Sequence, residues 1–290
     1  PGLNGREMNY PRGKTLGGSS SINGLLYIRG QSQDYNYWRQ LGNVGWSWED
    51  VLPYFKKSED NQRGTNEFHG VGGPLSVEDM RVKMKVLDTF IDAAEEFGFP
   101  RQSDFNTGEN EGIGYFQVTQ RNGFRCSTAV GYLNPIKHRK NLKIITQAHI
   151  KNIEFENNKA VSVNYWQGNQ LKKVKANIEI ILSAGSIGSP HILQASGIGP
   201  GELLKKNNVE VIKNQPAVGK NLQDHLMLRP VYKIKNLDTL NEAYHSLIKK
   251  MFIGINYFIF RKGPLTMGAS HLCGFIKSDE YLETPNLQFH

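Results

Sequence analysis

The stretch Gly13-Lys14-Thr15-Leu16-Gly17-Gly18-Ser19-Ser20-Ser21-Ile22-Asn23 decides how the rest of this sequence is interpreted. Two adjacent glycines allow backbone conformations that other residues rarely adopt, and they let backbone N–H groups approach a ligand closely. Three hydroxyl side chains follow at once. Such a loop suits phosphate or pyrophosphate, although a plain turn has the same composition. It is not a P-loop, because Met8 stands where that motif has its first glycine.

A second glycine-containing segment has the pattern of a strand followed by a helix. Residues 178–182 are apolar except for Glu179, and we interpret them as a buried strand. Ser183-Ala184-Gly185 then turns the chain. Ser189-Pro190 predicts a helix start, and Gly197 predicts its end. This unit fits either a nucleotide held at a helix N-terminus or an ordinary β–α connection.

The remaining periodicity alternates between helical and strand-like segments. Ser47 and Asp50 resemble a capping box that opens a helix through Lys57. Apolar residues at helical spacing predict further helices over 82–97, 127–133 and 237–260. A period of two, with Asn157-Asn158 as a hairpin turn, predicts short strands over 142–146, 150–156, 160–166 and 171–176.

Composition and charge exclude several classes of protein. The chain has 290 residues, 38% of them hydrophobic, and a net charge of +8, which is ordinary for a globular protein. Its two cysteines cannot form a disulfide framework and fit no zinc spacing, so we predict packed or free thiols and no metal site. No apolar run is long enough to span a membrane.

Most of the excess positive charge falls between residues 137 and 175. A basic patch can bind nucleic acid. However, the alternation of Val161, Val163 and Tyr165 with Ser162 and Asn164 predicts a solvated β-surface with its lysines opposite the core, so we expect no nucleic-acid partner.

Both glycine-containing segments resemble signatures of one family. Residues 13–23 resemble the first signature of the glucose-methanol-choline (GMC) flavin oxidoreductases, and residues 185–199 resemble the second. Supporting stretches are 46–55, 125–135 and 218–225, so the resemblance covers essentially the whole chain. The aromatic segment near the N-terminus and residues 261–266 look most like the insect glucose-dehydrogenase-like and choline-dehydrogenase-like branches.

The resemblance implies an α/β (α+β) fold in which a Rossmann-like FAD-binding domain is interleaved with an antiparallel-sheet substrate domain, both incomplete here. Residues 1–225 would form the incomplete FAD-binding region, with a loop, lid and substrate-domain excursion at about 31–140. Residues 226–290 would begin the C-terminal substrate domain. The G-x-G-x-x-G turn of the family is absent, so we expect the chain to be an internal fragment.

The resemblance also implies a cofactor, FAD, and positions around it. Gly17, Gly18 and Ser19 would line its pyrophosphate and ribityl region, and the flavin would lie along Asn23, Gly24, Leu25 and Leu26. Ile150 would offer backbone groups to the adenine. Ala184 and Gly185 would lie near the adenosine half.

The implied chemistry is the oxidation of CH–OH groups of alcohols or sugars by hydride transfer to flavin N5. The family's catalytic His is expected beyond His290, so no catalytic residue is assigned to this chain. The small-molecule substrate and the electron acceptor, whether oxygen, a quinone or another carrier, stay open, as does localisation, for which secretion is possible by resemblance. The alternative is a truncated, non-catalytic remnant or a binding protein that retains the fold.

Overall fold

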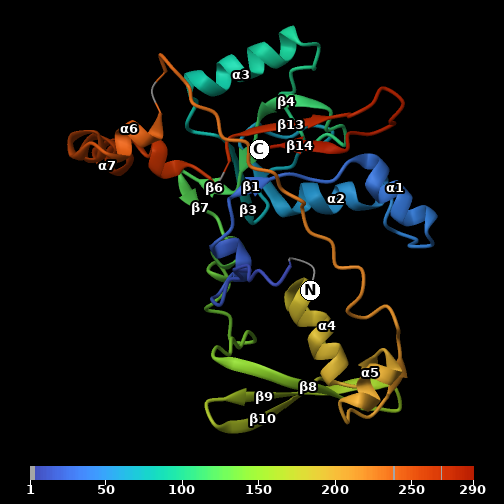
Figure 1. Ribbon diagram of the computed structural model, residues 1–290. Coiled ribbons are helices and arrows are strands. Elements are labelled where there is room, and N and C mark those ends of the chain that lie inside the picture. Colours follow the sequence, from blue (N-terminus) through green and yellow to red (C-terminus); the bar gives the residue numbers. More distant parts are fainter. Residues whose placement is uncertain (1–3, 238, 269) are drawn as a thin grey trace. The chain divides into compact units, whose positions relative to one another are not determined.

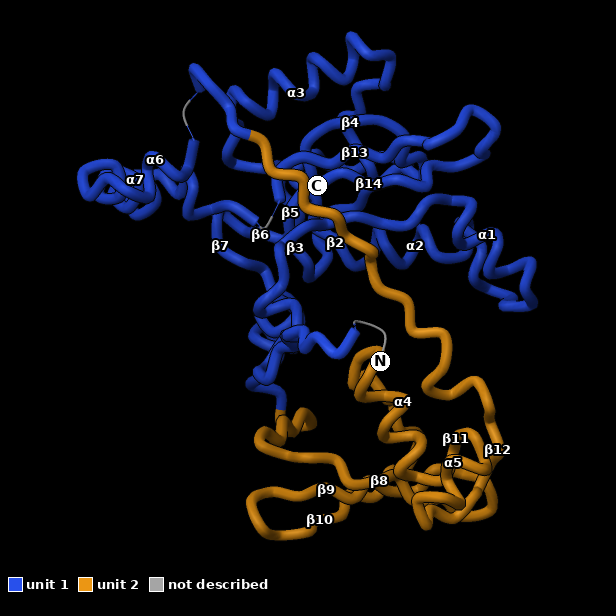
Figure 2. The backbone as a smooth tube through the Cα atoms, viewed as in Figure 1, with its two compact units in different colours: residues 1–139, 233–290 blue, residues 140–232 orange. Residues whose placement is uncertain are grey.

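The computed structural model of the chain describes residues 4–237, 239–268 and 270–290 (Figure 1). The chain folds as two compact units, one made of residues 1–139 and 233–290, the other of residues 140–232 (Figure 2). We call them unit 1 and unit 2. None of the described helices is both long and apolar enough to cross a membrane. The mixed α/β architecture predicted from the sequence is confirmed.

Unit 1 contains two small sheets and a hairpin. In the first sheet the order is β1-β5-β3-β2, with β2 parallel to β3 and the other pairs antiparallel. The second is antiparallel, in the order β14-β13-β4, and β6 pairs with β7. The strands are β1 (Leu26–Tyr27), β2 (Glu59–Asn61), β3 (Leu75–Asp79), β4 (Gly112–Tyr115), β5 (Gln117–Val118), β6 (Gln120–Arg121), β7 (Phe124–Arg125), β13 (Leu272–Ile276) and β14 (Leu287–Phe289).

The helices of unit 1 follow their sequence signals closely. Ser47 caps α2 through the predicted capping box. The Ser47 backbone N–H and hydroxyl both donate to the Asp50 carboxylate, and the Asp50 backbone N–H donates to the Ser47 hydroxyl. The predicted helix over 127–133 is the short π-helix η2. The elements are η1 (Gly18–Ser21), α1 (Ser32–Gln40), α2 (Trp48–Ser58), α3 (Lys85–Glu96), η2 (Ala129–Leu133), α6 (Leu240–Tyr244), α7 (Leu247–Phe260) and η3 (Pro264–Thr266).

The core of unit 1 lies between its two sheets and α3. One buried cluster joins Leu25 to Met80, Phe105, Phe116, Val118 and Cys273. A second joins Ile91 and Ala94 of α3 to Ile113 and Leu272. Both cysteines are buried free thiols, as predicted. Leu25 lies two residues after the glycine–serine loop (residues 13–23), so the chain is anchored in the core just beyond that loop.

Unit 2 is built on an antiparallel sheet in the order β10-β9-β8, from β8 (Ala148–Glu156), β9 (Lys159–Gln167) and β10 (Gln170–Lys175). Asn157 and Asn158, with φ of 50° and 62°, form the predicted hairpin turn. α4 (Gly185–Ala195) packs against β8, where the Ser196 hydroxyl accepts a hydrogen bond of 2.8 Å from the Ile153 N–H. The parallel pair β11 (Ile198–Gly199) and β12 (Lys213–Asn214) flanks α5 (Gly201–Lys206).

Several predicted elements are wrong. Residues 142–146 and 178–182 form no strand, and Ile178 and Ile181 are 86% and 78% exposed. A strand exists only where a neighbour accepts its backbone hydrogen bonds, and no described strand lies beside either run. α4 begins at Gly185, so Ser189-Pro190 lies inside it.

Two further predictions need correction. The helix over 237–260 is broken at His245-Ser246 into α6 and α7, and residue 238 of that span lies outside the described residues. Ser162, predicted to face solvent, is fully buried, and its hydroxyl is satisfied there by donating to Glu154 Oε2 at 2.6 Å. Among the lysines of β10, Lys173 pairs with Glu154, and Lys172 donates to Gln167 Oε1 at 2.8 Å.

Candidate functional site

The glycine–serine loop of unit 1 adopts a conformation that needs its glycines. Gly17 and Gly18 have φ of +87° and +54°, in the left-handed region that disfavours side chains. A Cβ on Gly13 would lie 2.0 Å from the Gly18 carbonyl oxygen, so the loop closes tightly on itself there. A Cβ on Gly18, by contrast, would meet no protein atom within 4 Å. The loop therefore presents one open backbone surface, at Gly18.

The loop is held by residues far away in the sequence. The Ser20 hydroxyl donates to the Gly17 carbonyl at 2.5 Å and accepts from the Thr128 N–H at 3.0 Å. The Arg125 guanidinium donates to the Ser20 carbonyl at 3.0 Å, to Asn23 Oδ1 at 2.7 Å and to the Asn23 carbonyl at 2.8 Å. Desolvation lowers the pKa of Arg125 from its ordinary value. These contacts fix the loop on both sides of η1.

Residues 23–26 lead from the loop into the core. Asn23 Oδ1 accepts from the Leu25 N–H at 3.1 Å, and Leu25, with φ of +69°, is only 6% exposed. The Leu25 carbonyl accepts from the Thr119 N–H at 2.8 Å, and Leu26 begins β1. Gly24 is approached closely from another segment, because a Cβ on Gly268 would lie 2.3 Å from the Gly24 carbonyl oxygen.

The segment that passes Gly24 leads to a half-buried imidazole whose Nε2 atom is buried. His271 Nε2 is buried without a hydrogen-bond partner among the described residues, and burial lowers the pKa of its ring. The His271 carbonyl accepts from the Phe116 N–H at 3.0 Å, which fixes the backbone. A neutral ring with an unpaired nitrogen can still bond a ligand group. No signal in the sequence distinguished this His from the other seven.

Three predicted cofactor residues lie in unit 2. Ile150 is in β8, opposite Tyr165 of β9. Ala184 is the N-cap of α4, and its N–H donates to the Ser189 hydroxyl at 3.0 Å. Gly185 has φ of +82°, and a Cβ there would meet no protein atom within 4 Å, as at Gly18. Unit 1 thus contains Gly17, Gly18, Ser19, Asn23, Gly24, Leu25 and Leu26 in one segment, while unit 2 contains Ile150 in β8 and Ala184 and Gly185 at the start of α4.

Unit 1 also contains a buried network of charges that the sequence pattern did not reveal. The Arg29 guanidinium lies 2.8 Å from Glu59 Oε1, and both side chains are almost fully buried. His69 lies between two carboxylates, with Nδ1 3.0 Å from Glu59 and Nε2 2.7 Å from Asp104. Although desolvation opposes its charge, the bonds to Asp104 and Glu59 raise the pKa of His69 to about 9.

This network lies just beyond β1, which follows the loop. The Arg29 N–H donates to Asn106 Oδ1 at 2.9 Å, and its guanidinium donates to the Phe68 and Asn106 carbonyls. It ties the end of β1 to the segments around residues 59–69 and 104–106, and we assign it a structural role. Among the described residues no group of three or more His, Cys, Asp or Glu side chains is placed to hold a metal.

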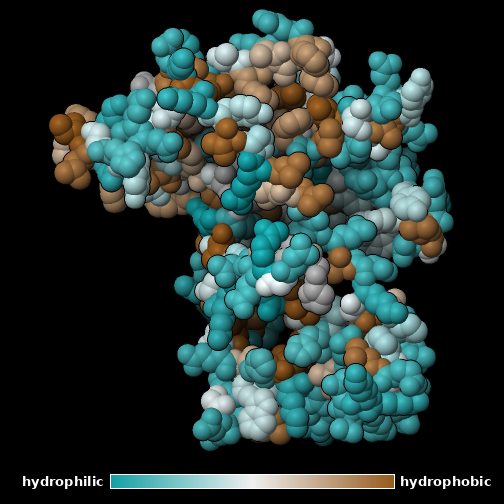
Figure 3. Space-filling view, in the orientation of Figure 1, coloured by the Kyte–Doolittle hydropathy of each residue, from teal (hydrophilic) through white to brown (hydrophobic). Residues whose placement is uncertain are grey.

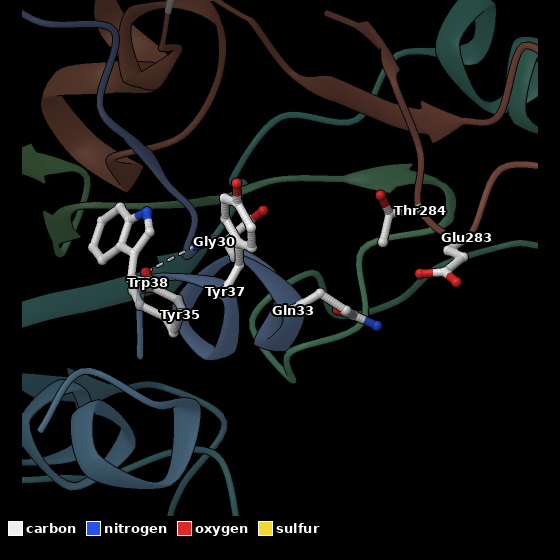
Figure 4. A pocket seen from close by; sticks show the side chains of 8 residues that line it. Gly30, Gln33, Tyr35, Tyr37, Trp38, Glu283 and Thr284 are labelled. Carbon is white, nitrogen blue, oxygen red and sulfur yellow. Dashed lines mark hydrogen bonds between the residues drawn. The ribbon is translucent and has the colours of Figure 1, made fainter. Parts of the chain in front are cut away.

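Each unit also has a shallow cavity. In unit 1 a cavity of about 500 Å³ lies between α1 and residues 283–284, with Tyr35, Tyr37 and Trp38 on one side (Figure 4). In unit 2 a cavity of about 460 Å³ is lined by β8 and residues 195–197 and 208–212. Neither includes a residue predicted to bind the cofactor, so these cavities add nothing to that site.

Comparison with known proteins agrees with the sequence motifs. The GMC oxidoreductase family profile matches residues 2–227. An alcohol dehydrogenase [acceptor] from Pseudomonas putida is 41% identical over 99% of this chain and 53% of its own length. An oxygen-dependent choline dehydrogenase from Vibrio vulnificus is 40% identical over 99% of this chain and 52% of its own. The chain thus spans about half the length of these curated relatives.

Solved structures show the same relationship. An FAD-dependent oxidoreductase from Chaetomium thermophilum is similar with a TM-score of 0.85 and 28% identity, covering 95% of this chain and 51% of that one. Pyridoxine 4-oxidase from Mesorbium loti gives a TM-score of 0.72 and 34% identity, covering 77% and 44%. The chain, with its glycine–serine loop held open at Gly18, belongs to the GMC oxidoreductase family.

Proposed function

We propose that the parent protein is an FAD-dependent oxidoreductase acting on CH–OH groups of alcohols or sugars, and that this chain supplies part of its FAD site. The observation that carries the proposal is the loop at residues 13–23, which is tethered by hydrogen bonds yet open to a ligand at Gly18. Bound FAD would supply the hydride acceptor, its N5 atom.

The residues present fit this cofactor. Gly18 leaves the backbone uncovered, and the exposed Ser19 adds a hydroxyl beside it, so the loop can lie against a pyrophosphate and ribityl chain. At Gly17 a Cβ would lie 2.5 Å from the Ser21 hydroxyl oxygen, so that glycine allows the loop to close on itself. Asn23, Gly24, Leu25 and Leu26 would follow the flavin, with the buried His271 nitrogen as an unpaired group on the neighbouring segment. Arg125 would act indirectly, by fixing Ser20 and Asn23.

In unit 2 we propose that Ile150, Ala184 and Gly185 serve the adenosine half. Gly185 is compatible with this role, because its left-handed backbone and open Cβ direction leave room for a ligand at the start of α4, as at Gly18. At Ile150 the backbone pairs with one neighbour only, since β8 is an edge strand of its sheet. An edge strand leaves backbone groups that can bond a base.

We further propose the domain division predicted from the sequence, with residues 1–225 as the FAD-binding region, an excursion at about 31–140, and 226–290 opening the substrate domain. The unit boundary at residues 139–140 supports the end of the excursion. The names of the two curated relatives, an alcohol dehydrogenase and a choline dehydrogenase, support an alcohol as the substrate class.

The test is to purify the full-length parent and record its visible spectrum. The proposal predicts flavin absorbance near one FAD per chain, together with alcohol-dependent reduction of an artificial dye. Parallel oxygen-consumption measurements distinguish an oxidase from a dehydrogenase. A colourless protein that reduces neither dye nor oxygen with any of a panel of alcohols and sugars would favour the non-catalytic remnant instead.

A further inference from the structure

Helix α7 presents its most apolar face to solvent. At 100° per residue, seven large apolar side chains fall within an arc of about 140° on one side of the helix. They are Leu247, Ile248, Met251, Phe252, Ile255, Phe258 and Ile259, each between 44% and 84% exposed. Figure 3 shows hydrophobic side chains at the end of the molecule formed by α7. An apolar strip of this kind is unusual on a protein surface and marks a binding face.

The opposite side of α7 is the side that packs on unit 1. Ile253 and Tyr257 are half-buried, and the Tyr257 ring lies 6.1 Å from the Phe124 ring. Arg261, just after the helix, stacks its guanidinium on the same Phe124 ring at 4.5 Å. The helix is thus anchored by its less apolar face, and the apolar arc points away from the rest of the unit.

The charges around the arc are mainly positive. Residues 247–262 contain Lys249, Lys250, Arg261 and Lys262 and no Asp or Glu, and the one carboxylate paired with them is Glu242 of α6, 3.8 Å from Lys249 among the described residues. The two lysines project about 60° beyond opposite edges of the arc, one on each side. This arrangement lets apolar side chains enter the acyl boundary of a bilayer while long basic side chains reach the lipid phosphates.

We propose that α7 docks the protein on the surface of an anionic lipid bilayer, lying in the interface without crossing it. The charge pattern favours this occupant over a second copy of the chain. A two-fold contact through the arc would bring the lysines of both copies to one interface, where like charges repel. The proposal goes beyond the flavin chemistry and does not depend on it.

The experiment uses the full-length parent and sucrose-loaded vesicles that are separated by sedimentation. The protein should sediment with vesicles of equal phosphatidylcholine and phosphatidylglycerol and bind vesicles of phosphatidylcholine alone more weakly. The double substitution Phe252→Glu with Ile259→Glu should lower the partition coefficient at least about tenfold. The matched control is Phe97→Glu with Val44→Glu, since these side chains are 82% and 86% exposed away from the arc.

Flavin content and melting temperature establish that each variant is folded. If the arc variant does not fold, Lys249→Gln with Lys250→Gln takes its place and should weaken binding to the anionic vesicles alone. The proposal is overturned if the wild-type protein stays in the supernatant, which would mean that the rest of the parent chain or a second copy covers the arc. Equal loss of binding in the control variant would overturn it as well.

Discussion

The buried imidazole of His69 should make stability depend on pH in a defined direction. Its side chain is fully buried between Glu59 and Asp104, and these carboxylates raise its pKa from 6.5 to about 9. In the unfolded chain the pKa of His69 returns to about 6.5. Between pH 6.5 and about pH 9 the imidazole is therefore protonated in the folded state but mostly neutral in the unfolded chain. The stabilising contribution is therefore complete below pH 6.5 and is lost as the pH rises through 9.

The size of the effect follows from the two pKa values. At about 1.4 kcal/mol per pH unit, a rise from 6.5 to about 9 corresponds to about 3 kcal/mol of unfolding free energy. The opposite dependence holds for Glu59 and Asp104, because the bonds from His69 and the charge of nearby arginines lower their pKa values despite desolvation. Their contribution is present above their unfolded pKa values and is lost in acid, as the pH falls through the lowered folded values.

Urea unfolding of the full-length parent, from pH 6 to pH 10, measures this directly. The difference in unfolding free energy between the wild type and His69→Gln should shrink by about 3 kcal/mol across the range. Asp104→Asn is a second variant that keeps the imidazole and should move the midpoint of the wild-type pH dependence to lower pH. A difference that is constant from pH 6 to pH 10 would show that His69 is not charged in the folded state.

Three further predictions concern single residues. Arg125→Met removes three hydrogen bonds to the loop, so it should lower the flavin content of the parent and reduce its unfolding free energy by about 1–3 kcal/mol in urea titrations. Unchanged values would mean that the loop is held without Arg125. Ser47→Ala should cost about 1 kcal/mol in the same titration with flavin content unaffected, because it removes only the cap of α2; a loss of flavin would contradict that assignment. Burial raises the pKa of Cys273 to about 12, so this thiol should resist a disulfide reagent at pH 8 until the protein is unfolded. Rapid labelling of Cys273 in the folded protein, identified by mass spectrometry, would contradict its buried position.

Local signals in the sequence were predictive where the chemistry is local. The capping box at Ser47 and the turn at Asn157-Asn158 involve residues within three positions of one another, and both form as predicted. The strand predicted over residues 178–182 is wrong because strand formation depends on contacts that are not local. This largely apolar run is compatible with a buried strand, but a strand also needs a partner, and pairing is a property of the fold and not of the run.

The candidate site divides in the same way. The run at Gly17-Gly18 indicated a left-handed backbone near a ligand, and the left-handed φ values are observed at both positions. Nothing in the sequence connected the loop to Arg125, which is 102 positions from Asn23, or placed His69 between two carboxylates. Such contacts depend on which distant segments come together in the fold. The residues around Arg125 and His69 show no periodic pattern that indicates their partners, so the sequence alone does not predict these contacts.

The most direct test of the central claim is the flavin content of the full-length parent carrying Gly18→Asn. Asparagine tolerates the left-handed conformation, so the variant mainly adds a side chain to the open surface. Gly168→Asn is the matched control, because Gly168 has φ of +59° against +54° at Gly18 and its Cβ direction is equally open, in the turn between β9 and β10. If the loop holds FAD, Gly18→Asn loses at least about nine-tenths of its flavin absorbance per mole while Gly168→Asn keeps it, since a side chain in contact with the cofactor costs more than about 1.4 kcal/mol of binding. Full flavin content in a folded Gly18→Asn protein would contradict the assignment of this loop to the cofactor.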